Sequence, residues 1–189
     1  MNRDFDNLKV ADQGCGKLRH LKIFYKYFNI IYLIDTEFQI NKTQRLFGNN
    51  NITIREYLSK NKIEDKEIHL ITAKKFTTTK LNLDLIFNIC VFDVEIPEVR
   101  KSIIESSFNN LRTKGLFILI VPRNISSILK RCNSNNKYLD GYYFKHHGIM
   151  TFYKNFDRID PLIKVLKEIG FTISADLTER QYICLILKK

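Results

Sequence analysis

The chain has 189 residues, of which 44% are hydrophobic and 12% aromatic, and this composition predicts one globular domain rather than a disordered chain. Its longest apolar run, 116–121, is far shorter than the roughly 20 residues that span a bilayer, and residues 1–7 lack an apolar signal core, so we expect a cytoplasmic protein without a membrane segment. The formal net charge of +11 favours a nucleic-acid partner, although solvated surface lysines explain it equally well.

The first predicted elements are a strand, a glycine turn and a helix within the segment LKVADQGCGKLR at 8–19. The strand is short and ends in Asp12, and Gly14 and Gly16 then allow a tight turn with close approach of the backbone to a ligand. Apolar residues at positions 18, 21, 25 and 28 recur at helical spacing.

A second apolar strand is predicted over 30–34, and Asp35 closes it. Asp35 follows Gly16 by 19 residues, close to the roughly 20 that bring a carboxylate onto ribose hydroxyls in a βαβ unit. The turn and the acid together predict a cofactor pocket. Leu18 stands where a dinucleotide-binding turn has its third glycine, which disfavours a nicotinamide enzyme.

At residues 12–18 and 32–35 the chain resembles the class I S-adenosylmethionine-dependent methyltransferases. The first motif of that family is typically acid-x-Gly-x-Gly-x-Gly, and its second strand ends in an acid; Leu18 departs from the commonest pattern. The resemblance implies S-adenosylmethionine as cofactor. It places Gly14 and Gly16 against the methionine part, with Asp12 orienting the amino end and Asp35 holding the ribose.

The next segment, 36–66, is polar and predicts one helix ending near Gly48 and another over about 53–60. Strands are predicted over 68–72 and 87–92, the second closed by Asp93. Pro97 suits the first turn of a further helix, which Gly115 is predicted to cap. The buried stripe of this helix is predicted at Val99, Ile103, Ile104, Phe108 and Leu111.

A fifth strand is predicted over 116–121, and a polar loop over 133–141. A helix from 160 to 169 and strands over 171–174 and 182–187 follow, and the short link between these two strands permits antiparallel pairing. The alternation of strands and helices predicts an α/β fold, a three-layer αβα sandwich. The resemblance adds a seven-stranded, mostly parallel sheet with an antiparallel last strand, in a single Rossmann-like methyltransferase domain over 1–189 with a substrate-facing insertion at about 123–158.

Ligands of open α/β sheets bind beyond the carboxyl ends of the strands, so the loops after four strands are expected to meet in one cleft. By resemblance, the loop after the third strand usually offers an acid to adenine, but here it is Thr72-Ala73-Lys74. The residues assigned to the cofactor are Asp12, Gly14, Cys15, Gly16, Asp35, Thr36, Thr72, Ala73 and Val91.

Asp93 is the predicted catalytic residue, because a carboxylate at the rim of the fourth strand can accept a proton from a hydroxyl or amine. Capping of the following helix is an equally good explanation for Asp93 and the better one for Glu95. This strand lacks the Asn/Asp-Pro-Pro-Tyr/Phe signature of many amino-directed DNA methyltransferases. Cys90 is predicted to be a buried strand residue, and the four scattered cysteines predict no structural metal.

Four residues, Arg19, Tyr143, Lys145 and His146, are candidates for substrate binding. In the segment 142–147, aromatic rings can stack on bases and cations can meet phosphate, but the rings can equally pack on a sheet edge. His146 and its neighbour His147 point to opposite sides of a strand, so they are not expected to chelate one metal ion. Lys17 and His20 are expected at the surface.

The sequence therefore predicts a methyltransferase that acts on oxygen or nitrogen of an unidentified acceptor. Net charge favours nucleic acid, and the lack of an appended recognition domain favours a small molecule. The alternative is a non-catalytic adaptor or subunit of a larger complex, with a protein partner or as a homo-oligomer, because the third and fourth motifs depart from the family pattern.

Overall fold

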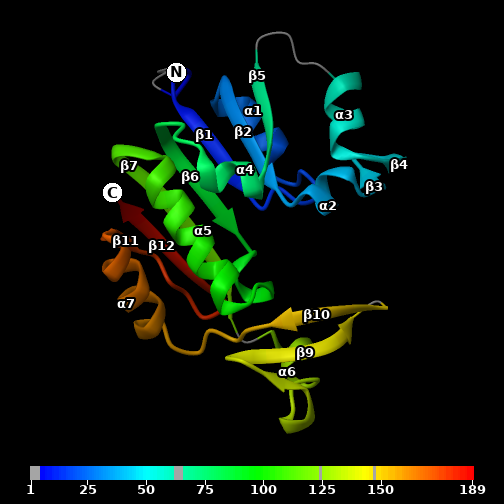
Figure 1. Ribbon diagram of the computed structural model, residues 1–189, viewed down its shortest axis with the longest axis vertical. Coiled ribbons are helices and arrows are strands. Elements are labelled where there is room, and N and C mark those ends of the chain that lie inside the picture. Colours follow the sequence, from blue (N-terminus) through cyan, green and yellow to red (C-terminus); the bar gives the residue numbers. More distant parts are fainter. Residues whose placement is uncertain (1–4, 62–65, 124, 147) are drawn as a thin grey trace. The chain divides into compact units, whose positions relative to one another are not determined.

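A computed structural model describes residues 5–61, 66–123, 125–146 and 148–189 (Figure 1). The chain forms two compact units, the first made of residues 1–87 and 110–115 and the second of residues 88–109 and 116–189. Strands β6 (Leu83–Ile89) and β7 (Leu111–Pro122) each have residues in both units. The expectation of a single domain with an insertion at 123–158 stays a prediction.

A seven-stranded sheet has the strand order β11-β12-β7-β6-β1-β2-β5. β1 pairs in parallel with β2 and β6, and β2 pairs in parallel with β5. β12 is antiparallel to both β7 and β11. The predicted α/β fold, with helices flanking a mostly parallel sheet that carries an antiparallel last strand, is confirmed.

The first unit alternates strands and helices from its start, and Figure 1 shows β1, β2 and β5 side by side. Its elements besides β6 are β1 (Lys9–Gln13), α1 (Leu21–Tyr27), β2 (Ile30–Asp35), α2 (Glu37–Asn41), β3 (Gln44–Leu46), β4 (Asn49–Ile52), α3 (Ile54–Lys60), β5 (Glu67–Thr72) and α4 (Ala73–Thr78). β1 and β2 are buried along most of their length, as their continuous apolar runs predict. The core of this unit is therefore built around the strands that lead into the glycine turn.

Two predictions for the first unit are wrong. The helix expected to end near Gly48 is the five-residue α2 followed by the β3–β4 hairpin, because Phe47 and Gly48 adopt φ values of +47° and +89° and form a two-residue turn of the kind that joins antiparallel strands. Gly115 does not cap a helix but lies inside β7, where a Cβ would come within 2.9 Å of the Arg112 carbonyl oxygen and 3.0 Å of the Leu83 carbonyl oxygen.

The second unit contains two longer helices and a hairpin that Figure 1 shows as β9 and β10. Its elements besides parts of β6 and β7 are the 3-10 turn η1 (Phe92–Val94), α5 (Pro97–Asn110), α6 (Ser126–Leu129), η2 (Ser134–Asn136), β8 (Lys137–Tyr138), β9 (Gly141–His146), β10 (Ile149–Tyr153), α7 (Asp160–Ile169), β11 (Thr172–Asp176) and β12 (Tyr182–Lys188). α7 begins with Pro161 in its first turn and ends at Gly170 in the left-handed region, as the sequence predicts.

The boundaries around η1 and α5 also differ from the prediction. β6 ends at Ile89 rather than Phe92, because Cys90 adopts a φ of +56° and leaves the strand; Cys90 is exposed, so the prediction of a buried thiol is wrong. Val99 was expected in the buried stripe of α5 but is exposed, whereas Ser107 is buried with its hydroxyl donating to the Ile103 carbonyl oxygen at 2.7 Å.

Candidate functional site

The glycine turn of the first unit is held against the end of β2 by backbone hydrogen bonds. The amides of Gly14 and Cys15 both donate to the Ile34 carbonyl oxygen, at 2.8 and 3.1 Å. Gly14 and Gly16 have φ values of +87° and +51°, a region that residues with a Cβ avoid. These two positions therefore need glycine for the turn itself.

Asp35 binds this turn directly. Its two carboxylate oxygens accept from the Gly16 amide at 2.7 Å and from the Thr36 amide at 2.8 Å. Burial raises the pKa of Asp35, whereas these two hydrogen bonds oppose the rise. A carboxylate has about four acceptor positions, so Asp35 retains capacity for two further donors such as hydroxyls.

Asp12 is a buried acid with spare hydrogen-bonding capacity. Its side chain is 1% exposed, and among the described residues Oδ2 has no hydrogen-bond partner. His20 Nδ1 lies 3.6 Å from that oxygen, and the Asp12 carboxylate raises the pKa of His20 against the opposing effect of burial. A buried carboxylate oxygen without a donor is a ready site for an ammonium or amino group.

The side chain of His20 is 30% exposed, so its expected surface position stays a prediction, but the sequence did not indicate its contact with Asp12. Sequence reasoning missed it because only the fold brings a residue just before α1 next to a strand residue eight positions earlier. Arg19 and Lys17 are exposed, and a role for Arg19 in substrate binding stays a prediction.

Leu18 explains how the turn tolerates the loss of its third glycine. Leu18 has a φ of +57°, the left-handed conformation that favours glycine, yet its side chain is completely buried in the core beside α1. A left-handed conformation costs a residue with a Cβ about 1 to 2 kcal/mol, and burial of a leucine side chain stabilises by about 1.5 to 3 kcal/mol. The backbone path is kept because apolar burial offsets the strain.

The remaining cofactor candidates of the first unit cap helices or lie in the core. The hydroxyls of Thr36 and Thr72 accept from the amides of Gln39 and Lys75, both at 3.2 Å, and Ala73 is the first residue of α4. Asp35 and Thr72 are paired in register at the ends of β2 and β5. Cys15 is buried, and burial raises the pKa of its thiol well above the ordinary value.

An exposed aromatic ring close to Asp35 was not predicted. Phe38 lies in α2, three residues after Asp35, and is 74% exposed, with the Lys42 ammonium 5.7 Å from the ring centroid. Its exposure could not be predicted, because a phenylalanine in a short helix is ordinarily assigned to the core.

Asp93, the predicted catalytic residue, lies in η1 of the second unit and is 4% exposed. Burial raises its pKa to about 6. Asp93 Oδ1 has no hydrogen-bond partner within the described ranges. Burial raises the pKa of Tyr153 to about 12, with the Asp93 carboxylate adding to the rise. Two buried titratable groups, Asp93 and Tyr153, therefore lie near each other in this unit.

The hairpin β9–β10 carries the other substrate candidates. Tyr143 is half-buried and contacts the rings of Tyr138 in β8 and Phe152 in β10, at centroid distances of 5.3 and 5.6 Å, so it packs within the three-stranded sheet of β8, β9 and β10. Lys145 is exposed, and His146 ends β9 with a side chain that lies outside the described part of the chain, as does His147. Substrate binding by Tyr143, Lys145 and His146 stays a prediction.

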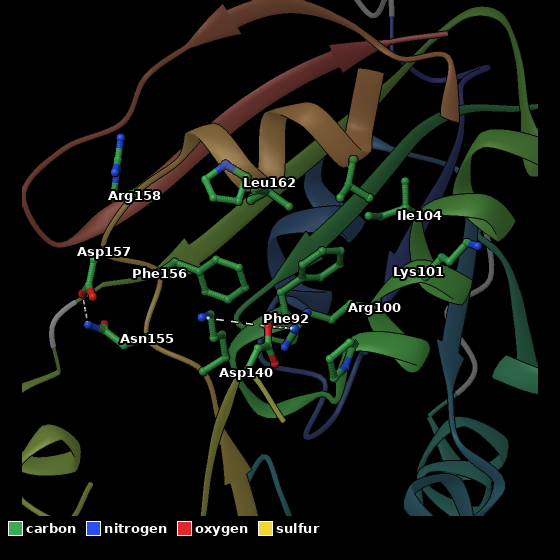
Figure 2. A pocket seen from close by; sticks show the side chains of 14 residues that line it. Phe92, Arg100, Lys101, Ile104, Asp140, Asn155, Phe156, Asp157, Arg158 and Leu162 are labelled. Atoms are coloured by element: carbon green, nitrogen blue, oxygen red, sulfur yellow. Dashed lines mark hydrogen bonds and ion pairs between the residues drawn. The ribbon is translucent and has the colours of Figure 1, made fainter. Parts of the chain in front are cut away.

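The same unit contains a cavity of about 630 Å³ (Figure 2). Its wall includes Phe92 of η1, the first half of α5, the segment 154–158 after β10 and the start of α7. The Lys154 amide donates to the Asp93 carbonyl oxygen at 2.7 Å, so this segment is bonded to η1. This volume is in the range of small-molecule pockets, roughly 300 to 1,000 Å³.

The structure therefore brings together the candidates of the first unit, from Asp12 to Asp35, in and around the glycine turn. Val91 directly precedes η1 and lies with Asp93 in the second unit. The expected meeting of Val91 and Asp93 with the glycine turn stays a prediction. No group of three His, Cys, Asp or Glu side chains in the described ranges is arranged to hold a metal ion, and no described helix is long and apolar enough to cross a membrane.

No protein-family model matches the chain, and no curated protein matches it in sequence. Its fold is nevertheless shared by many solved structures. It is similar to an S-adenosylmethionine-dependent methyltransferase from Methanosarcina mazei, with a TM-score of 0.70, 13% identity, and coverage of 97% of this chain and 93% of that one.

Two further similar structures contain bound S-adenosylhomocysteine. One is the 1,6-didemethyltoxoflavin-N1-methyltransferase of Burkholderia thailandensis, with a TM-score of 0.62, 12% identity, and coverage of 97% of this chain and 72% of that one. The other is the magnesium protoporphyrin IX methyltransferase of Synechocystis, with a TM-score of 0.64, 14% identity, and coverage of 98% and 76%. The chain has the fold of the class I S-adenosylmethionine-dependent methyltransferases.

Proposed function

We propose that the chain is an S-adenosylmethionine-dependent methyltransferase that acts on oxygen or nitrogen of its acceptor. The observation that carries the proposal is the glycine turn, which keeps its left-handed backbone at three positions and is bonded to Asp35. The fold supports the proposal, since similar structures carry S-adenosylhomocysteine.

The residues of the first unit fit this cofactor. Asp12 Oδ2 is buried and has His20 Nδ1 at 3.6 Å but makes no hydrogen bond among the described residues, so it suits the amino end of the methionine part. Asp35 retains acceptor capacity for the two ribose hydroxyls after its bonds to the Gly16 and Thr36 amides. The exposed ring of Phe38 offers an apolar face near Asp35.

When bound, the cofactor would supply a methyl group on a sulfonium sulfur, with the sulfur as the leaving group, for transfer to the acceptor oxygen or nitrogen. Asp93 is proposed to take the acceptor proton, because a carboxyl group with a pKa of about 6 is largely ionised at neutral pH yet basic enough to accept one. Holding the acceptor in line supplies much of the rate in such a displacement.

Thermal unfolding with added ligand tests the proposal. S-adenosylhomocysteine at 100 times its dissociation constant is expected to stabilise the protein by about 2.7 kcal/mol, and NAD is expected to have no effect. Asp12→Asn and Asp35→Asn should each reduce the stabilisation, whereas the matched control Glu67→Gln, at an exposed position of β5, should keep it.

Stabilisation by NAD but not by S-adenosylhomocysteine would refute the cofactor assignment. Stabilisation by S-adenosylhomocysteine without methyl transfer to any acceptor would favour the alternative of a non-catalytic adaptor.

A further inference from the structure

The cavity of the second unit has an apolar body. The buried side chains of Phe92, Ile104, Phe156 and Leu162 line it, and Figure 2 shows Phe156 on the left, Leu162 near the top centre and Ile104 on the right. Apolar walls of this kind favour a ligand with an apolar, ring-sized body, because burial of such surface is favourable.

One charged group lies deep in this cavity. The Arg100 side chain is 9% exposed and is fixed by its hydrogen bond to the Glu95 carbonyl oxygen at 2.6 Å and by an ion pair with Asp140. Its guanidinium carbon also lies 5.6 Å from the Phe156 ring centroid. Arg100 is thus held rigidly against the aromatic wall.

The ion pair of Arg100 is not neutral as a group. Lys154 Nζ lies 3.9 Å from the same Asp140 oxygen, so two cationic side chains share one carboxylate. Glu95 and Glu98 also favour the charged form of Arg100, but neither lines the cavity. A positive charge in a half-enclosed apolar space is costly without a counter-charge, and an anionic ligand would supply it.

The charges at the rim do not remove this excess. Lys101 pairs with Glu105 at 3.8 Å and Arg158 with Asp160 at 3.7 Å, and all four side chains are largely exposed. Asp157, the second acid of the lining, is exposed and bonded to the Asn155 amide; Figure 2 shows this pair well away from Arg100 and Asp140. Among the residues that line the cavity, the group formed by Arg100, Asp140 and Lys154 therefore has two cationic side chains and one carboxylate.

We infer that this cavity binds the methyl acceptor, and that the acceptor is a small organic anion, such as an aromatic carboxylate, with a ring-sized apolar body. The role of the ligand as methyl acceptor rests on the proposed function, whereas the presence of an anion site does not. Two features link the cavity to Asp93: Phe92, a wall residue, directly precedes it, and Lys154 lines the cavity while its amide binds the Asp93 carbonyl oxygen.

Calorimetric titration of the full chain with 1-naphthoate and with 1-naphthamide tests the anion site. These probes have the same ring system, so the difference between their affinities reports the effect of the carboxylate charge. The carboxylate is expected to bind at least about tenfold more tightly, since a charge-assisted hydrogen bond is stronger than a neutral one. Equal affinity, or no binding of either probe, would overturn the inference.

Variants locate the site. Lys154→Gln should remove most of the preference for the carboxylate, whereas the control Lys164→Gln, on the exposed face of α7, should leave it unchanged. Leu162→Trp should fill the cavity and abolish binding of both probes; Ile104→Phe, a smaller intrusion from α5, gives the same test if the tryptophan variant does not fold. Wild-type affinity in Lys154→Gln and in a folded cavity-filling variant would place the anion elsewhere and overturn the inference.

Methyl transfer separates the two halves of the inference. With S-adenosylmethionine, transfer to 3-hydroxybenzoate but not to 3-hydroxybenzamide supports an anionic acceptor. Binding of S-adenosylhomocysteine without binding of naphthoate refutes the anion site alone. Binding of naphthoate without binding of S-adenosylhomocysteine refutes the proposed function, and with it the acceptor role of the cavity.

Discussion

Replacing Asp93 by Asn should make the folded protein more stable at neutral pH. Burial raises the pKa of Asp93 from 3.8 to about 6, so the folded chain holds this proton more tightly than the unfolded chain does. As pH rises through this window the unfolded chain loses the proton first, and stability falls. Each pKa unit corresponds to about 1.4 kcal/mol, so ionising Asp93 costs the folded protein about 3 kcal/mol above pH 6.

Asp93→Asn removes this cost because its side chain cannot ionise. Urea unfolding at pH 4 and at pH 7.5 should give similar stabilities for the variant and the wild type at pH 4, and a variant that is more stable by about 2 to 3 kcal/mol at pH 7.5. The control Asp160→Asn changes an acid that is 75% exposed and should show no such difference between the two pH values. A stability difference for Asp93→Asn that is the same at both pH values would refute the argument from burial.

Three further predictions concern the turn, the thiols and the charge. Leu18→Ala should lower the free energy of unfolding by about 2 to 5 kcal/mol. Leu18→Gly should lower it by no more than Leu18→Ala does, the reverse of the usual order, because glycine relieves the strain of the left-handed backbone. A larger loss for the glycine variant would show that the backbone is unstrained. A thiol reagent such as Ellman's should modify the exposed Cys90 well before the buried Cys15, whose raised pKa leaves little thiolate, and early loss of Cys15 by mass spectrometry would contradict the turn geometry. If the net charge of +11 serves a nucleic-acid partner, affinity for a short RNA should fall steeply with salt, by about 0.7 log unit per log unit of salt for each phosphate contacted; a flat dependence favours the small acceptor.

The local pattern around the glycine turn could be predicted from sequence because its parts are close together along the chain. The strand before Gly14, the two glycines and the acid at the end of the next strand are each specified by residues within the segment, and the structure joins Gly16 to Asp35 by a hydrogen bond. Continuous apolar runs likewise specified the parallel strands β1 and β2.

Contacts between distant segments could not be predicted in this way. Arg100 meets Asp140 across 40 residues, and Tyr153 lies near Asp93 across 60, with no periodicity that links either pair. The cavity therefore could not be predicted from the sequence. Arginine, lysine and aspartate, the residue types of its charged group, are ordinarily exposed, so they did not indicate a cavity.

Backbone conformation accounts for the wrong boundaries. Phe47 and Cys90 adopt positive φ values, at a hairpin turn and just beyond a strand end, although neither residue type favours that region. The apolar pattern therefore predicted a longer helix and a longer strand than the structure contains, because the pattern continues past the positions where the chain turns.

Titration of 15N-labelled protein with S-adenosylhomocysteine, followed by NMR, tests the central claim most directly. The claim is that the glycine turn and Asp35 hold one ligand, and the amides of Gly16 and Thr36 both report on it because each donates to the Asp35 carboxylate. Both resonances are expected to shift along a single binding curve, together with that of Gly14. If the Gly16 and Thr36 amides do not respond, or if they respond with different dissociation constants, the shared site does not exist and the assignment of the cofactor is wrong.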